Sequence, residues 1–133
     1  MAKFIGADKH LKRLQGMGGA ALREGKKLVY VLADMHATEA ALSITAGAVS
    51  GKGHIASKPG EAPNADTHML DRSIHVEMTG PLTAQSVADA PYAVALEFDM
   101  DRPFMRPAAA KVRKSVDALA SAAVDRIVAG SKL

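Results

Sequence analysis

The chain has 133 residues, of which 48% are hydrophobic and 23% are charged, and its formal net charge is +3. This length fits one folded domain with a real core and is too short for two. The chain contains no cysteine, which excludes disulfides, thiolate nucleophiles and cysteine-based zinc sites. No apolar run approaches the roughly 20 residues of a membrane-spanning helix. The first ten residues lack the apolar segment of a signal peptide, so we expect synthesis in the cytoplasm and no membrane partner.

Aromatic residues make up only 4% of the chain and tryptophan is absent, whereas alanine and valine are abundant. Such a core has few large anchors, so we expect the isolated chain to have modest stability and to be more stable in an assembly. The basic residues form short clusters at Lys9–Arg13, Arg23–Lys27 and Lys111–Lys114, and no aromatic residue lies within them. These clusters are typical of solvated helix faces. A small basic DNA-binding protein remains an alternative, which a steep salt dependence of duplex binding would support.

Residues 8–46 are predicted to form one long helix, preceded by an N-terminal tail of residues 1–7. Asp8 is a candidate N-cap, and Gly47 follows the last periodic position. Four glycines between Gly16 and Gly25 predict a weak or kinked point, because each costs a helix roughly 1 kcal/mol relative to alanine. The apolar positions that predict this helix are Leu11, Leu14, Met17, Ala21, Leu28, Leu32, Met35, Leu42 and Ala46.

The segment that follows, Gly51–Thr67, is rich in glycine, proline, serine and asparagine and is predicted to be a mobile loop. A connection this long inside a compact domain is unusual, so we expect it to order when a partner binds. Residues 72–80 then alternate as a half-buried strand, which Gly80 and Pro81 close. In that strand one face carries Ile74, Val76 and Met78, and the other carries Ser73, His75 and Glu77.

Two further strands and a closing helix are predicted. Residues 83–90 indicate a weaker second strand, and residues 92–98 alternate as a third, although their alanine and leucine content leaves a helical turn possible. Pro107 suits the first position of a helix that Gly130 ends. The core positions of this helix are Val112, Val116, Leu119, Ala123 and Ile127. The order predicts an α+β domain with a long N-terminal helix, a small antiparallel sheet and a C-terminal helix packed on the sheet.

Glu97, Asp99 and Asp101 are the strongest hint of an enzyme. On an extended chain they share a face, and three carboxylates there would suit a magnesium ion in a metal-dependent hydrolase. Loss of magnesium-dependent cleavage in Asp99→Asn would support that alternative. Ion pairing of these acids with Arg102 and Arg106 is the favoured interpretation, since no nucleophile or general base accompanies them.

The five histidines show no metal-ligand spacing. His68 and His75 lie near Asp66 and Asp71 in the sequence, which makes a metal site conceivable. We predict no metal site, no cofactor and no catalytic residue.

Three segments occur in a recognisable order: residues 62–77 read APNADTHMLDRSIHVE, residues 90–98 read APYAVALEF, and residues 102–108 read RPFMRPA. They resemble the small head–tail joining, or tail-completion, proteins of long-tailed double-stranded DNA phages. Those proteins typically show Pro-x-x-Thr-Gly-x-Leu-x-x-Ser-Ile-x-Val, then Tyr-Ala-x-x-x-Glu-Phe-Gly, then Pro-Phe-x-x-Pro-Ala before a final helix. The matching positions are Thr67, Leu70, Ser73, Ile74, Tyr92, Ala93, Glu97, Phe98, Pro103, Phe104, Pro107 and Ala108. The resemblance covers about residues 8–130.

This resemblance implies a structural virion protein of the neck, made in the bacterial cytoplasm. Its subunits would form a homo-oligomeric ring, expected to be six-fold, between the tail tube protein and the head-side connector or stopper protein. DNA would pass through the ring without sequence-specific contact. A tail terminator that caps the tube and sets its length is the related alternative. The implied structural or interface residues are Thr67, Leu70, Ser73, Ile74, Tyr92, Glu97, Phe98, Pro103, Phe104 and Pro107.

Two positions depart from the family pattern, since His68 and Asp99 stand where the family has glycine. Glycine there allows a positive φ, which aspartate tolerates in part and histidine less well. The resemblance also implies that residues 97–107 form a corner between a strand and the last helix. Phe98 and Phe104 would anchor this corner to the core, and Glu97 would be a structural or interface acid.

Overall fold

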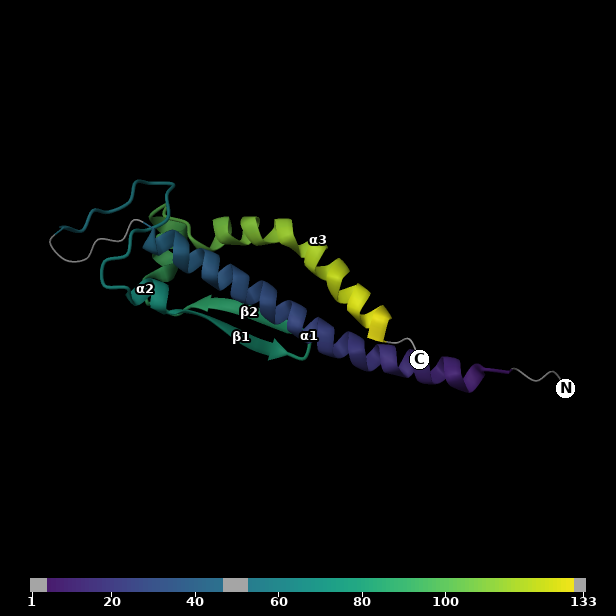
Figure 1. Ribbon diagram of the computed structural model, residues 1–133. Coiled ribbons are helices and arrows are strands. Elements are labelled where there is room, and N and C mark those ends of the chain that lie inside the picture. The colour runs from purple at the N-terminus through teal and green to yellow at the C-terminus, as the bar shows by residue number, and fades with distance from the viewer. Residues whose placement is uncertain (1–4, 47–52, 131–133) are drawn as a thin grey trace.

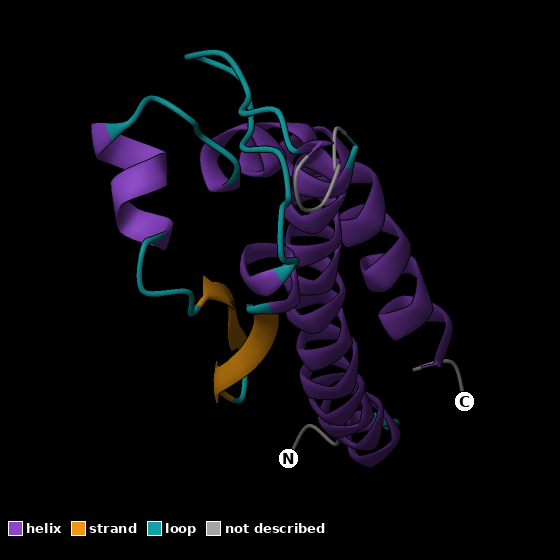
Figure 2. Ribbon diagram, turned by 90° about the vertical axis from the view of Figure 1, so that its left-hand side faces the viewer, coloured by secondary structure: helices purple, strands orange, loops and turns teal. Residues whose placement is uncertain are grey.

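The computed structural model describes residues 5–46 and 53–130. Figure 1 shows the long helix α1 (Ala7–Thr45) as the axis of the molecule, with a β-hairpin on one side and the C-terminal helix α3 on the other. Figure 2 shows the same order at right angles, with α1 between the hairpin and α3. Both the hairpin and α3 contact α1, so α3 is joined to the sheet through this helix. The predicted α+β class is confirmed.

Helix α1 runs without a break through all of its glycines, including Gly16 and Gly25. The expected cap is wrong in detail, because Gly6 occupies the N-cap position with φ 91° and Asp8 lies in the first turn. A carboxylate there still favours the helix through its dipole. The expected stop at Gly47 lies outside the described residues.

The buried face of α1 carries four alanines and one large residue, Ile44, and the apolar periodicity did not single these positions out. Its buried positions are Ala20, Ala33, Ala37, Ala40 and Ile44. By contrast Leu11, Leu14 and Leu42, which were expected to face the core, are each about half exposed. Alanine allows the hairpin and α3 to approach the helix axis closely, and the larger side chains are left outside that contact.

A short helix, α2 (Met69–Arg72), leads into the antiparallel strands β1 (Ile74–Gly80) and β2 (Thr83–Ala88). Both predicted strands are therefore confirmed, and Pro81 lies in the tight turn between them. The register pairs Ile74 with Ala88 and Val76 with Ser86, and it shifts at a bulge between Met78 and Gly80. The hairpin turn lies so close to α1 that a Cβ added at Gly25 would lie 2.8 Å from Leu82 Cδ2.

The third predicted strand is wrong. Residues 93–99 are helical, and Ala95–Asp99 form a single π-helical turn, η2. The alternating pattern there is built from alanine, valine and leucine, which fit a helix as well as a strand. As a consequence, Glu97, Asp99 and Asp101 do not share one face as they would on an extended chain.

Helix α3 spans Met105–Gly130 and packs along α1. It begins two residues before Pro107, so the predicted position of that proline as the first helical residue is wrong by two places. Its core side is as predicted, with Val112 and Ala123 buried. The helix continues to the last described residue, Gly130, so the stop expected after it lies outside the described residues. Arg126 Nε lies 2.8 Å from Glu24 Oε2, which ties the last turns of α3 to α1. Figure 1 shows the first turns of α1 extending beyond this end of α3.

Residues 54–67 contain no helix or strand and lie against the end of the molecule that holds α2 and η2 (Figure 1). The amide of Ala65 donates to Ile44 O at 3.1 Å, and Gly60 N donates to Asp101 O at 2.6 Å. Ser57 and Ala65 are buried. The predicted loop thus has contacts of its own with the body of the chain, and whether a partner orders it further stays a prediction.

The main core gathers at this same end of the molecule. It comprises Ala40, Ile44, Ala65, Leu70, Ala90, Ala93, Phe104 and Ala108. Phe104 and Ile44 are the largest fully buried side chains, so the expectation of few large anchors holds. Among the helices that the structure describes, none combines the length and the apolar character needed to cross a membrane.

Candidate functional site

The Glu97 side chain caps the beginning of α3. Its Oε2 accepts hydrogen bonds from the backbone amides of Phe104 at 2.8 Å and Met105 at 3.0 Å. Its Oε1 accepts from the Arg106 amide and from Arg106 Nε, both at 3.0 Å. The first amides of a helix have no partner within it, so this carboxylate supplies partners that the chain lacks locally.

The Glu97 carboxylate is surrounded by N–H donors and by the positive charge of Arg106, although its side chain is only 6% exposed. Burial raises the pKa of this carboxyl group, but the three backbone amides and the Arg106 guanidinium lower it by more. The net result is a pKa below the ordinary value of 4.5. Arg106 Nη2 also donates to the Glu97 carbonyl oxygen at 2.7 Å, so one arginine holds both ends of the residue.

The two phenylalanines of the corner have different roles. Phe104 is fully buried and anchors the start of α3, as predicted. Phe98 is 64% exposed and covers no core, so its prediction as an anchor is wrong. The Arg106 guanidinium lies over its ring at 5.0 Å from the centroid. In the helical turn at residues 95–99, Glu97 is buried and Phe98 is exposed. A strand with Phe98 on its core face would have given the reverse.

The three acids do not form a shared site. Glu97 is buried, whereas Asp99 and Asp101 are exposed. Both Glu97 oxygens are occupied by N–H donors, and Arg102 pairs with Ser57 rather than with an acid. Within residues 5–46 and 53–130, no group of three or more histidine and acidic side chains could hold a metal ion. The local pairing expected for Arg106 with these acids is present with Glu97 alone.

The first motif wraps around α2. Leu70 is buried in the core, and Ile74 packs against it from the start of β1. Ser73 closes α2 by donating from its Oγ to Leu70 O at 2.6 Å. Thr67 is exposed. These positions therefore have structural tasks, apart from Thr67.

One of the two departures from the family pattern falls at an unusual backbone conformation. His68 has φ 62°, in the left-handed region that glycine adopts most easily. Its Nδ1 lies 3.1 Å from Asp71 Oδ2, three residues ahead. Asp99, the other departure, lies in η2, and the positive φ of 50° occurs at Asp101 instead. The glycine of the family pattern thus agrees with the geometry at position 68 and disagrees at position 99.

The remaining motif residues lie around the same corner. Tyr92 is 41% exposed and lines a cavity between the 53–67 loop, α2 and η2. Pro103 is partly buried, and Pro107 is exposed on the first turn of α3. All three motifs therefore meet at one end of the molecule, and Leu70, Ala93, Phe104 and Ala108 share its core.

Two polar links that sequence reasoning missed connect distant segments. His36, on α1, lies with its Nδ1 against Ser86 Oγ of β2 and its Nε2 2.7 Å from the Met105 carbonyl oxygen. A carbonyl only accepts, so Nε2 donates and a neutral ring then accepts from Ser86 at Nδ1. Arg102 donates from Nη2 to the Ser57 carbonyl oxygen at 2.8 Å. A lone histidine in a helix and an arginine among acids carry no sequence signal for these partners.

The basic clusters are paired in part. Lys27 Nζ lies 3.8 Å from Glu24 Oε1, and Lys111 Nζ lies 3.7 Å from Glu39 Oε2. All four groups are on helices, and both lysines are largely exposed. This is the solvated helix surface that the sequence predicted.

No family model matches the chain, and comparison with curated proteins and with solved structures finds no match.

Proposed function

We propose that this chain is a structural subunit of a phage neck, a head–tail joining or tail-completion protein that forms a ring at the head–tail interface. Its neighbours in the particle would be further copies of the chain, the tail tube protein and the head-side connector or stopper protein. In this role the chain performs no chemistry, and its mechanism is assembly.

The meeting of the three motifs at one core carries this proposal. Leu70 comes from the first motif, Ala93 from the second, and Phe104 from the third, and all three belong to one buried cluster. Glu97 of the second motif binds the backbone of the third. A chance likeness in three short segments gives no reason for their side chains to make one corner, whereas a shared fold does.

The distribution of apolar side chains supports an assembling subunit. Large apolar residues are exposed along and just before α1, in the hairpin turn, in and just before η2, and on α3: Ile5, Leu11, Leu14, Leu22, Val31, Leu42, Leu82, Val94, Phe98, Val124 and Val128. A specific interface buries about 800 Å² on each partner, and contacts between copies in a ring would cover part of this surface.

The projecting end of α1 suits such contacts in particular. Its first turns extend past α3 and the hairpin (Figure 1), and Leu11 and Leu14 are about half exposed there. In proteins, most of the stability of a helix comes from packing of its apolar side against other elements. We infer that a neighbouring copy covers this end in the ring.

Localisation of the protein in purified particles tests the proposal. A peptide tag is added to the chain, and gold-labelled antibody against the tag is imaged on particles by electron microscopy, with untagged particles as the control. Gold at the junction of head and tail is the expected result. Particles that lack the protein, or gold on the capsid or tail fibres, would refute it.

A further inference from the structure

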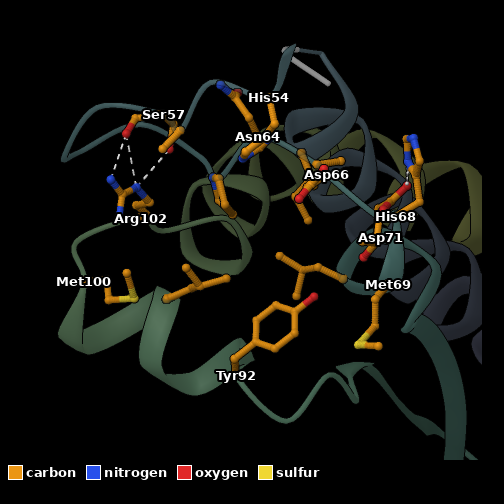
Figure 3. A pocket seen from close by; sticks show the side chains of 17 residues that line it. His54, Ser57, Asn64, Asp66, His68, Met69, Asp71, Tyr92, Met100 and Arg102 are labelled. Atoms are coloured by element: carbon orange, nitrogen blue, oxygen red, sulfur yellow. Dashed lines mark hydrogen bonds and ion pairs between the residues drawn. The ribbon is translucent and has the colours of Figure 1, made fainter. Parts of the chain in front are cut away.

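A cavity of about 260 Å³ lies at the end of the molecule where the motifs meet. It opens between the 53–67 loop, α2 and η2, and Ile44 of α1 forms part of its wall. Figure 3 shows the Tyr92 ring between Met69 and Met100. The walls of the cavity are mostly apolar: Ile44, Ala65, Leu70 and Leu96 line it together with Met69, Tyr92 and Met100. The cavity is therefore large enough for an amino acid side chain or a small organic molecule.

Asp71 lines this cavity, and one of its carboxylate oxygens lacks a hydrogen-bond partner. Its side chain is only 10% exposed, and its Oδ2 is held by the His68 ring at 3.1 Å. Its Oδ1 is buried, and nothing in the part of the chain that the structure describes donates a hydrogen bond to it. A buried acceptor without a donor is costly, and more so when it belongs to a charged group.

Arg102, the arginine that lines the cavity, makes no hydrogen bond to this oxygen. Arg102 lies on the opposite side of the view in Figure 3, where its guanidinium donates to Ser57 O and Ser57 Oγ. Asp66 adds a second carboxylate to the lining, and His54 and His68 add two imidazoles. The Asp71 carboxylate favours a cation as the charge of a ligand in this cavity.

We propose that this cavity binds an ammonium or guanidinium group carried on an apolar stem. The cation donates a charge-assisted hydrogen bond to the Asp71 carboxylate, and the stem packs against Leu70, Leu96 and Met69. The face of Tyr92 offers the cation a further favourable contact. A lysine or arginine side chain of another protein subunit and a free alkylamine share this chemistry. The inference rests on the cavity and on Asp71, and it does not depend on the proposed function.

Titration of the isolated protein with n-butylammonium and n-butylguanidinium, followed by backbone amide chemical shifts, tests the proposal. Uncharged n-butanol is the matched ligand control, since it has the same stem. We expect saturable binding of a cation in the millimolar range, with shifts at Asp71 and Tyr92 and little effect of butanol. Asp71→Asn keeps the shape of the side chain and removes its charge, and it should weaken binding about tenfold or more. Asp99→Asn, an exposed site outside the cavity, should leave binding unchanged.

A second variant keeps the test decisive if Asp71→Asn does not fold. Tyr92→Leu removes a half-exposed ring and should weaken cation binding severalfold in a folded protein. Absence of saturable cation binding to the native chain would overturn the proposal. Equal affinity of the native chain and Asp71→Asn, or equal affinity for butanol, would do the same.

Sedimentation of the native chain with and without butylammonium separates the two sources of the cation. If a neighbouring copy supplies the side chain, butylammonium and Asp71→Asn both reduce self-association. If a free amine is the ligand, self-association is unchanged while butylammonium still binds. Either result is compatible with the proposed site and identifies its occupant.

Discussion

Glu97 fixes the corner between η2 and α3 through a cap that is remote in sequence. Most N-caps are short side chains immediately before the helix, but here the carboxylate comes from a residue seven to nine positions earlier. The length of the glutamate side chain and its two oxygens allow it to reach three successive amides. Its negative charge also lies at the positive end of the α3 dipole. The residue therefore positions a whole helix with respect to the core.

Replacing Glu97 with glutamine should destabilise the protein. Glutamine has a single acceptor oxygen, so it cannot satisfy the amides of Phe104, Met105 and Arg106 together, and it does not pair with the arginine. We expect the free energy of unfolding to fall by about 1–3 kcal/mol, measured by urea denaturation. Asp99→Asn is the control, because that acid is exposed, and it should change stability by less than about 0.5 kcal/mol. Equal stability of Glu97→Gln and the native chain would contradict the capping role.

The same carboxylate should make stability depend on pH in the acid range. Its pKa in the folded chain lies below the ordinary value of 4.5, so the unfolded chain binds the proton more tightly. The stabilisation is therefore complete above the unfolded pKa and is lost as the pH falls through the folded pKa. Urea midpoints measured from pH 6 down to pH 3 should fall for the native chain and fall less for Glu97→Gln. Parallel curves for the two proteins would rule out Glu97 as the source.

At the scale of elements, α1 organises the fold, and its small residues decide how closely the others approach. The alanine face of α1 receives the hairpin and α3, and Gly25 lies where Leu82 of the hairpin turn comes nearest. Other glycines of α1, such as Gly18, have open space around the position of a Cβ. Glycine at these two kinds of position therefore has different consequences for stability.

Alanine substitutions at two glycines should separate these effects. Gly18→Ala should stabilise α1 by about 0.5–1 kcal/mol, since it improves helix propensity and meets no neighbouring atom. Gly25→Ala has the same intrinsic gain, but its Cβ would lie 2.8 Å from Leu82 Cδ2, so the Leu82 side chain must move away from α1 and lose part of that contact. Amide hydrogen exchange along α1 and thermal unfolding by circular dichroism measure both. An equal gain at the two sites would mean that the close approach of Leu82 to α1 has no energetic weight.

The elements with strong local signals were predictable from the sequence. The hairpin follows from clear alternation in residues 74–78 and from the Gly80–Pro81 turn, and α3 follows from its regular apolar spacing. The helical turn at residues 93–99 was not predictable in this way, because its apolar residues fit the period of a helix as well as that of a strand. The hydrogen bonds that Glu97 accepts from the start of α3 come from residues seven to nine positions away. The buried alanines of α1 were missed for a similar reason, since periodicity weighs large side chains and the close contact requires small ones.

The candidate site was predictable only in part. The importance of Glu97 and Phe104 followed from the family resemblance, and both are buried at the corner. The sequence singles out Asp71 only as a neighbour of His68 in a conceivable metal site, because its unpaired oxygen depends on the fold of α2 against the 53–67 loop. The partners of His36 are likewise separated from it by 50 and 69 positions.

At the scale of the whole molecule, the hairpin, α1 and α3 form three layers, and α1 is the middle one. The hairpin and α3 both pack on α1, and His36 of α1 bonds to both of them through Ser86 and Met105. The core is small and contains Phe104 as its single fully buried aromatic residue within the described chain. Such a subunit is expected to have modest stability on its own and to gain from contacts that cover its exposed apolar residues.

Replacing His36 with leucine should weaken the connection between the layers. The ring keeps one hydrogen bond to each outer layer, and leucine makes neither. We expect a loss of about 0.5–1.5 kcal/mol in the free energy of unfolding, with faster amide exchange both in β2 and at the start of α3. His10→Leu is the matched control, because His10 is exposed on the first turns of α1. Faster exchange in one layer alone would show that His36 does not couple the two.

Electron microscopy of particles made without this gene, before and after the purified protein is added back, tests the proposed neck function most directly. For a joining subunit we predict full heads separate from tails of normal length, which the added protein rejoins. Separate heads with overlong or uneven tails would assign the chain to tail termination instead. Intact and normally joined particles in the absence of the gene would contradict a role in the neck.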